Sequence, residues 1–117
     1  MERFNEPTVL FVTVTLRKPN TYHCFDNAGF HRSLLTGWTR ACEWHPGYYL
    51  IMPDHLHVFC VSDLVDSCPV KAWCKKWKGL VSTNVGPRNW RWLPDCWDTQ
   101  IRNQEHYLEK LEYVRQN

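Results

Sequence analysis

The sequence predicts an α+β fold of ferredoxin-like type, in which an antiparallel sheet carries helices on one face and an extra helix follows at the C-terminus. Two observations support this prediction. Runs of strand character alternate with segments of helical period in the order βαββαβα. The two middle strands are joined by so short a connection that they must pair antiparallel, because a parallel pair needs a long crossover.

The N-terminal part is expected to form one strand and one helix. The strand covers about residues 9–16, where aromatic and β-branched residues are dense, and residues 17–20 form the turn after it. The helix covers about residues 27–43, because its apolar residues recur at helical spacing and Pro46-Gly47 closes the stretch. These apolar residues are Phe30, Leu34, Leu35, Trp38 and Cys42.

The middle of the chain is expected to form two strands, at about 47–52 and 55–62, and a second helix. The helix begins near Pro69, which suits a first helical position, and the turn-rich stretch 83–89 ends it. Its apolar residues again recur at helical spacing, with lysines on or beside the exposed faces. They are Val70, Trp73, Trp77 and Leu80.

The C-terminal part is expected to form a fourth strand at about 96–101 and a final helix with Asn103 as its N-cap. At about 100° per residue, one side of this helix should be buried. That side consists of Tyr107, Leu108, Leu111 and Val114. Tyr113 lies on an adjacent face with His106 and Asn117. Its hydroxyl should stand clear of the core, either as a nucleophile or on a surface tyrosine whose ring covers the core edge.

Length and composition predict a single domain over residues 1–117. The formal net charge is only +2, so a nucleic-acid partner would need local basic patches. The six cysteines show no C-x-x-C spacing, and the first residues lack an apolar signal core. We therefore expect reduced thiols and a cytoplasmic location. No apolar stretch reaches the roughly eighteen residues of a membrane span, so no membrane partner is expected.

Two histidines, His55 and His57, open the third predicted strand. Residues i and i+2 of a strand share one face about 6.5–7 Å apart, a span that one metal ion can bridge if both imidazoles lean inward. Leu56 should point the other way, into the core. The same spacing also arises by chance on half-exposed strands, so spacing alone leaves open the choice between a metal site and two unrelated histidines.

Two segments interleave cations with large aromatic rings, a mixture that binds phosphates and stacks unpaired bases. The first, on the second helix, contains Lys71, Trp73, Lys75, Lys76, Trp77 and Lys78. The second contains Arg88, Trp90, Arg91 and Trp92. The alternative for both segments is that the tryptophans face the core and the cations form a solvated face.

Taken together, these patterns resemble the HUH single-tyrosine transposases, especially the REP-associated tyrosine transposases of bacteria. The HUH motif of that family is similar to the run Met52-Pro53-Asp54-His55-Leu56-His57. The family's catalytic pattern, Tyr-Ile-x-x-Asn-Pro, is similar to Tyr113-Val114-Arg115-Gln116-Asn117. Residues 11–15 and 97–103 resemble the family in the same order, so the resemblance spans nearly the whole chain. The family pattern continues with proline and a further tail after the asparagine.

The resemblance implies a transposase-like HUH endonuclease domain that nicks and rejoins single-stranded DNA, often folded as imperfect hairpins. Tyr113 would be the nucleophile, and His55, His57 and Asn117 would hold a divalent ion, Mg²⁺ or Mn²⁺. The product would be a 5′-phosphotyrosine link with a free 3′-hydroxyl, formed by a monomer or a homodimer. Two alternatives are a non-catalytic DNA-hairpin-binding module and a small metal-binding or interaction protein without a DNA role.

Overall fold

The computed structural model describes residues 8–17, 29–41, 43–62, 68–85 and 91–116. Within these ranges the elements follow the predicted order βαββαβα. They are β1 (Thr8–Thr15), α1 (Phe30–Arg40), β2 (His45–Ile51), β3 (His55–Ser62), α2 (Val70–Val85), β4 (Trp97–Ile101) and α3 (Gln104–Arg115). The predicted α+β fold class is confirmed.

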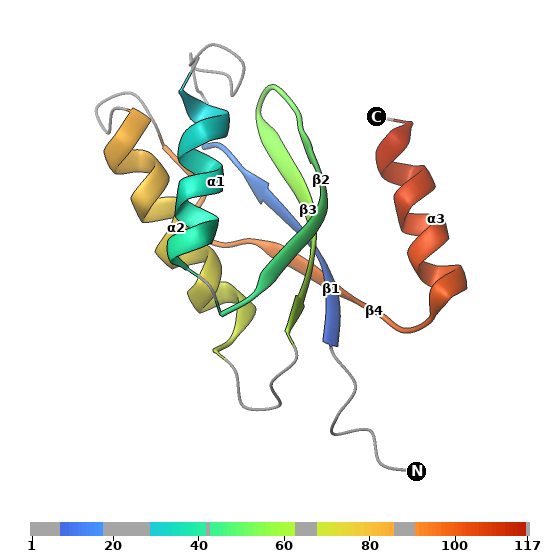
Figure 1. Cartoon of the computed structure of the whole chain (residues 1–117). Helices are drawn as coiled ribbons and strands as arrows, with labels where there is room; N and C mark the ends of the chain where they lie inside the picture. Colours follow the sequence, from blue (N-terminus) through green and yellow to red (C-terminus); the bar gives the residue numbers. More distant parts are fainter. Residues whose placement is uncertain (1–7, 18–28, 42, 63–67, 86–90, 117) are drawn as a thin grey trace.

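The strands form one sheet in the order β2-β3-β1-β4, and every neighbouring pair is antiparallel. Helix α1 connects β1 to β2, and helix α2 connects β3 to β4, so each helix passes over one intervening strand (Figure 1). This is the ferredoxin-like arrangement that the sequence predicts.

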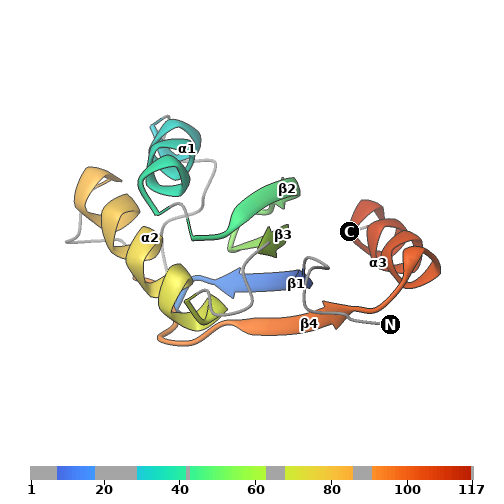
Figure 2. The ribbon, with the colours of Figure 1, turned by 60° about the horizontal axis from the view of Figure 1, so that its bottom comes forward.

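The sheet separates two layers of helices. Helices α1 and α2 cover one face, and the extra helix α3 lies on the other (Figure 2). Alternate residues of β1 follow this division: Val12 and Val14 are buried in the core with α1 and α2, whereas Phe11 packs with Phe59 and Val114 in a second cluster under α3. Each face of the sheet therefore has its own apolar layer, and the layer under α3 is the smaller one.

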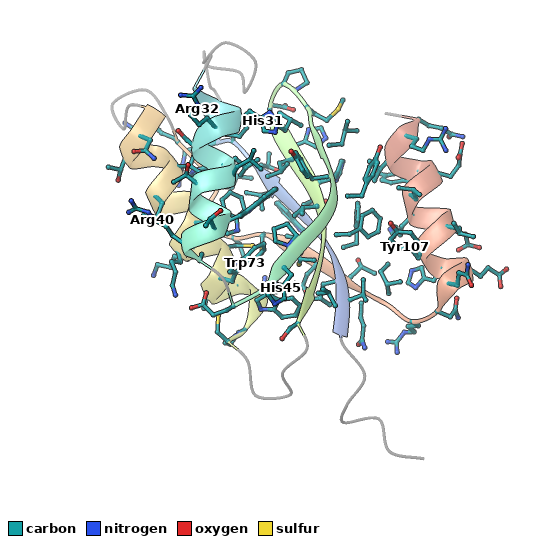
Figure 3. The ribbon with its side chains drawn as sticks, viewed as in Figure 1. His31, Arg32, Arg40, His45, Trp73 and Tyr107 are labelled. Carbon is teal, nitrogen blue, oxygen red and sulfur yellow. The ribbon has the colours of Figure 1, made fainter. Side chains whose placement is uncertain are left out.

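The larger core contains several large aromatic rings among its aliphatic side chains. The rings of Trp38 on α1 and Trp77 on α2 meet edge to face, with 5.9 Å between their centroids. Trp73 also lies fully buried between α2 and the sheet (Figure 3). The indole Nε1 of Trp73 donates a hydrogen bond to the carbonyl oxygen of Ala41 over 2.6 Å, which joins α2 to the end of α1.

Three elements have bounds that differ from the predictions by two residues or more. Helix α1 covers only 30–40, so it begins later and ends earlier than expected. Strand β2 begins at His45, because a register shift between Pro46 and Tyr49 accommodates the Pro-Gly pair within the strand. Helix α2 continues to Val85, past the start of the expected turn.

Leu108, which was predicted to be buried, is exposed, and so is Leu35 of the apolar spacing on α1. On α3, the residues that pack on the sheet are Tyr107, Leu111 and Val114, which are spaced by four and three. This stripe is narrow, and Leu108 lies beside it. Within the described ranges, no helix is long and apolar enough to cross a membrane, and the described cysteines, Cys60, Cys68, Cys74 and Cys96, form no disulfide.

Candidate active site

The start of β3 brings the two histidines together on the α3 side of the sheet. Leu56 between them is fully buried in the opposite core, as predicted. The ring centroids of His55 and His57 are 4.8 Å apart, and the rings meet edge to face. The alternation of the strand therefore gives two neighbouring imidazoles on one face.

Each imidazole is oriented by a partner at its Nδ1 atom. His55 Nδ1 lies 2.8 Å from Asp54 Oδ1, and His57 Nδ1 lies 2.9 Å from Thr13 Oγ1. A neutral histidine that donates its Nδ1 hydrogen keeps a lone pair on Nε2, which is the form that binds metal ions. Asp54 and Thr13 are thus placed to orient both rings for such binding.

His57 is held in the neutral form by its surroundings. Its ring is buried and stacks on Phe11, with centroids 5.3 Å apart and planes 19° apart. Burial, together with the nearby charges of His55 and Lys110, lowers the pKa of His57 to about 4. The ring therefore remains unprotonated, and available as a ligand, throughout the neutral range.

This low pKa predicts an acid-dependent loss of stability in the metal-free protein. An unfolded histidine takes up a proton near pH 6.5, whereas folded His57 does so only near pH 4. The unfolded state therefore binds more protons as the pH falls from 6.5 to 4, and the contribution of His57 to the free energy of unfolding should fall by up to about 3 kcal/mol.

The measurement is urea unfolding at several pH values with EDTA present, on the wild type and on His57→Gln. Carboxylates titrate in both proteins, so the difference between the two pH profiles isolates His57. The expectation is a weaker dependence between pH 6.5 and 4 in the variant. Parallel profiles would show that His57 is protonated equally in the folded and unfolded chains.

Helix α3 positions the tyrosine. Asn103 caps the helix as predicted, because its side chain accepts a hydrogen bond from the backbone N–H of His106 over 2.8 Å. The same hydrogen bond places His106 at the start of the helix, in the first turn. Tyr107, labelled in Figure 3, packs on Phe59 with 4.8 Å between ring centroids, and Val114 is fully buried in the same apolar cluster. These contacts fix the rotation of the helix about its axis.

That rotation turns Tyr113 toward the histidines. The ring centroids of Tyr113 and His57 are 6.4 Å apart within one chain, and Tyr113 is 57% exposed. The Nζ atom of Lys110, one turn earlier on α3, lies 5.4 Å from the Tyr113 ring centroid and 5.3 Å from that of Phe11. The tyrosine therefore combines access to solvent with proximity to the histidine pair.

These side chains line a pocket of about 490 Å³ between the sheet and α3. Four elements contribute to its walls: β1, β3, β4 and α3. Among the lining residues are Thr13, His55, His57, Trp97, Lys110 and Tyr113. The predicted nucleophile and the two predicted histidine ligands thus share one cavity.

The donors of this pocket fit a divalent ion in part. Two imidazoles are available from His55 and His57, a set that suits Mn²⁺ somewhat better than Mg²⁺. Asn117, the predicted third ligand, lies outside the described residues. Among the residues that the structure describes, no group of three His, Cys, Asp or Glu side chains gathers for a metal. The remaining ligands would have to come from Asn117, water or a substrate.

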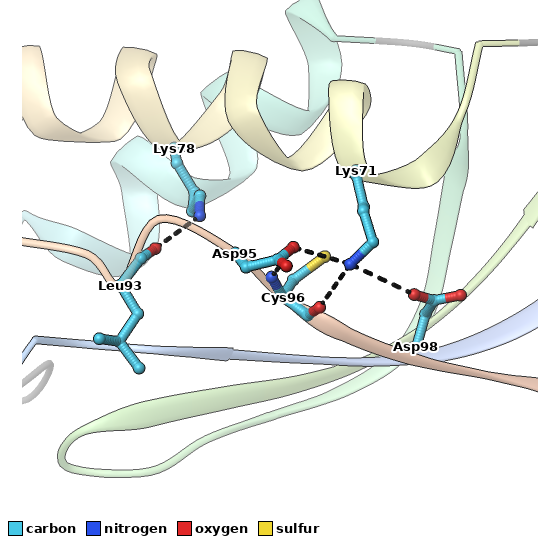
Figure 4. Close-up of polar contacts among 6 residues, drawn as sticks. All are labelled: Lys71, Lys78, Leu93, Asp95, Cys96 and Asp98. Atoms are coloured by element: carbon cyan, nitrogen blue, oxygen red, sulfur yellow. Dashed lines mark hydrogen bonds and ion pairs between the residues drawn. The ribbon is translucent and has the colours of Figure 1, made fainter.

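The lysines of α2 lie on the other side of the sheet. Lys71 pairs with Asp95 at 2.7 Å and with Asp98 at 3.9 Å (Figure 4), and Lys76 pairs with Glu43. These ion pairs offset part of the positive charge that the sequence shows. Lys75 is exposed on the same helix.

Lys78, which was predicted to lie on or beside an exposed face of the helix, is buried. It falls four residues after Cys74 and three before Val81, both buried, so it belongs to the apolar face of α2. Its Nζ donates a hydrogen bond to the carbonyl oxygen of Leu93 over 2.9 Å (Figure 4), and burial lowers its pKa. This hydrogen bond therefore links α2 to the segment before β4.

The tryptophans of the first predicted patch follow the alternative hypothesis, since Trp73 and Trp77 are both fully buried. In the second patch, Arg88 and Trp90 lie outside the described residues, and Arg91 is exposed. DNA binding by Lys71, Lys75, Lys76 and Arg91 remains a prediction. All four belong to segments other than those that line the histidine–tyrosine pocket.

Four residues of the site were not identified from the sequence: Thr13, Trp97 and Lys110, which line the pocket, and Asp54, which contacts His55. A signal was present for two of them, because Asp54 directly precedes His55, and Lys110 is one helical turn from Tyr113. Thr13 and Trp97 reach the pocket only through the strand register, which pairs Thr13 with both His57 and Trp97.

Comparison with solved structures finds the same fold in a REP-associated tyrosine transposase bound to a REP hairpin. The TM-score is 0.74, the sequence identity is 19%, and the match covers 97% of this chain and 68% of the transposase chain. At this identity the match establishes the fold. No protein-family model matches the sequence, and no curated protein is detectably similar to it.

Proposed function

We propose that this chain is a metal-dependent, single-tyrosine DNA endonuclease and strand transferase that acts on single-stranded DNA carrying hairpins. The observation that carries the proposal is the pocket in which Tyr113 lies beside His57, with ring centroids 6.4 Å apart and His55 adjacent. Hairpin DNA is supported as the substrate class by the fold match, because that transposase was solved bound to a REP hairpin.

The histidine pair supplies the proposed metal ligands. The Nε2 atoms of His55 and His57 would hold Mg²⁺ or Mn²⁺, with Asn117 as the third protein ligand. An ion held there would withdraw charge from the scissile phosphate and orient it. The contacts of Asp54 and Thr13 at Nδ1 would keep both imidazoles in the required tautomer.

Tyr113 performs the proposed covalent step. Its phenolic oxygen attacks the scissile phosphorus, and a bond from phosphorus to the tyrosine oxygen forms as the bond to the 3′ oxygen breaks. The phenol loses its proton, and the departing 3′ oxygen gains one, so a free 3′-hydroxyl and a 5′-phosphotyrosine link result. Because one phosphodiester replaces another, the link can be attacked by a new 3′-hydroxyl, which completes strand transfer.

The structure also bears on the subunit that supplies the tyrosine. Tyr113 reaches His57 within one chain, so the proposed nucleophile and the histidine pair do not need a second copy to come together. This geometry supports a monomer, or a homodimer in which each tyrosine acts at the histidine pair of its own chain.

The test is to incubate the full chain with a pool of end-labelled DNA hairpins that have randomised single-stranded flanks. We expect a covalent protein–DNA adduct on a denaturing gel with Mn²⁺ and none with EDTA. Salt-sensitive hairpin binding without any adduct would contradict the enzyme and identify a binding module. Absence of both binding and adduct would contradict any role in DNA processing.

A further inference from the structure

The pocket contains one large ring that the proposed chemistry does not use. Trp97, on β4, is 58% exposed and lines the pocket together with His57 and Tyr113. The other tryptophans of β-strand and helix segments described here are buried or half-buried. An indole with this much exposed surface, at the edge of a polar cavity, is available to stack on a ligand.

The register of the sheet determines where Trp97 stands. His57 pairs with Thr13, and Thr13 pairs with Trp97, so the three residues form one row across β3, β1 and β4. Adjacent strands are about 4.8 Å apart, which places the Trp97 backbone about 10 Å from that of His57. A nucleotide attached to a phosphate at the histidines can extend its base over this distance.

A positively charged side chain lines the same cavity. Lys110 lines the pocket from α3, with its Nζ 5.4 Å from the Tyr113 ring centroid. Among the described residues, no carboxylate forms an ion pair with Lys110, in contrast to Lys71 and Lys76. A compact ammonium group in this position is suited to a phosphate.

We propose that Trp97 and Lys110 form a subsite for one unpaired nucleotide next to the scissile phosphate, in which Trp97 stacks on the base and Lys110 contacts the DNA backbone. This inference rests on the proposed function of the pocket. Stacking on an indole accepts any base, so the subsite demands an unpaired nucleotide rather than a particular sequence. The pocket would thus distinguish a single-stranded flank from a paired stem.

The experiment compares two DNA probes and five variants of the full chain. One probe is a labelled hairpin with a randomised single-stranded tail, and the other is the same hairpin with an abasic tail. Binding is measured by fluorescence anisotropy over a series of salt concentrations. The variants are Trp97→Leu, Trp97→Phe, Lys110→Met and two controls, Leu108→Ala and Arg32→Met. Leu108 is an exposed apolar residue of α3, and Arg32 is an exposed cation of α1, across the sheet (Figure 3).

The subsite predicts a distinct pattern for each variant. Trp97→Leu should weaken binding of the probe with the randomised tail by about tenfold. The affinity for the probe with the abasic tail should stay unchanged, because only stacking on a base is lost. Trp97→Phe should retain most of the affinity. Lys110→Met should weaken binding of both probes. It should also reduce the slope of log affinity against log salt concentration by about one, because one phosphate contact is lost. Both controls should bind as the wild type does.

Several outcomes would overturn the subsite. One is equal affinity of Trp97→Leu and the wild type for the randomised tail, with adduct formation intact; the proposed function would then stand without the subsite. Another is unchanged DNA affinity together with a dimer that becomes a monomer, which would make Trp97 a subunit contact. If the wild type binds neither probe, both the subsite and the proposed function are wrong.

Discussion

Replacing Tyr113 by phenylalanine is expected to reduce covalent adduct formation with hairpin DNA by at least about 10³-fold, because the variant lacks the oxygen that bonds to phosphorus. The ring and its contact with His57 are retained, and the side chain is 57% exposed. The free energy of unfolding should therefore change by no more than about 0.5 kcal/mol. Adduct is measured on a denaturing gel with Mn²⁺, and unfolding is measured with urea.

Tyr107→Phe is the matched control for this substitution. Tyr107 lies on the same helix, but its ring packs on Phe59 under the helix rather than beside the histidines. Its variant should form adduct at the wild-type level. An adduct that persists in Tyr113→Phe would assign the nucleophile to another residue. Unchanged noncovalent hairpin binding in that variant would show that Tyr113 acts in the chemistry and not in recognition.

Much of the fold could be predicted because its signals are local. The spacing of Val70, Trp73 and Trp77 shows a helix within a single stretch of sequence, and the short link before His55 requires an antiparallel pair. The histidine pair follows from the two-residue repeat of a strand, a property that does not depend on distant contacts. The fold class and the order of the elements can therefore be predicted without knowledge of the tertiary structure.

The remaining parts of the site depend on contacts between distant segments. Thr13 reaches His57 from 44 residues away in the sequence, through the pairing of β1 with β3. Trp97 reaches the same row from β4, and neither register can be inferred from periodicity. The ion pairs of the α2 lysines could not be predicted from the sequence either, because their partners, Glu43 and Asp95, come from other parts of the chain. A basic segment in the sequence is thus not by itself a basic surface.

The histidine pair gives the second large expected effect. His55→Ala should lower the affinity for Mn²⁺ by at least about 100-fold, since it removes one of two imidazole ligands. Adduct formation should fall with it. His55 is preferred to His57 for this test because His57 is buried against Phe11, and its removal would leave a cavity. The affinity is measured directly by calorimetry without DNA, so the result does not depend on catalysis.

Asp54→Asn and His45→Ala make the histidine test specific. Asp54 contacts His55 Nδ1 at 2.8 Å, so its amide variant should weaken Mn²⁺ binding by about tenfold while it leaves both imidazoles in place. His45 is an exposed histidine on β2, and its variant should bind Mn²⁺ as the wild type does. A graded series, with the largest loss for His55, a smaller loss for Asp54 and none for His45, is expected only if the two imidazoles are ligands. Equal Mn²⁺ affinity in the wild type and the three variants would show that the metal binds elsewhere. Adduct formation in EDTA would show that Tyr113 reacts without a metal ion.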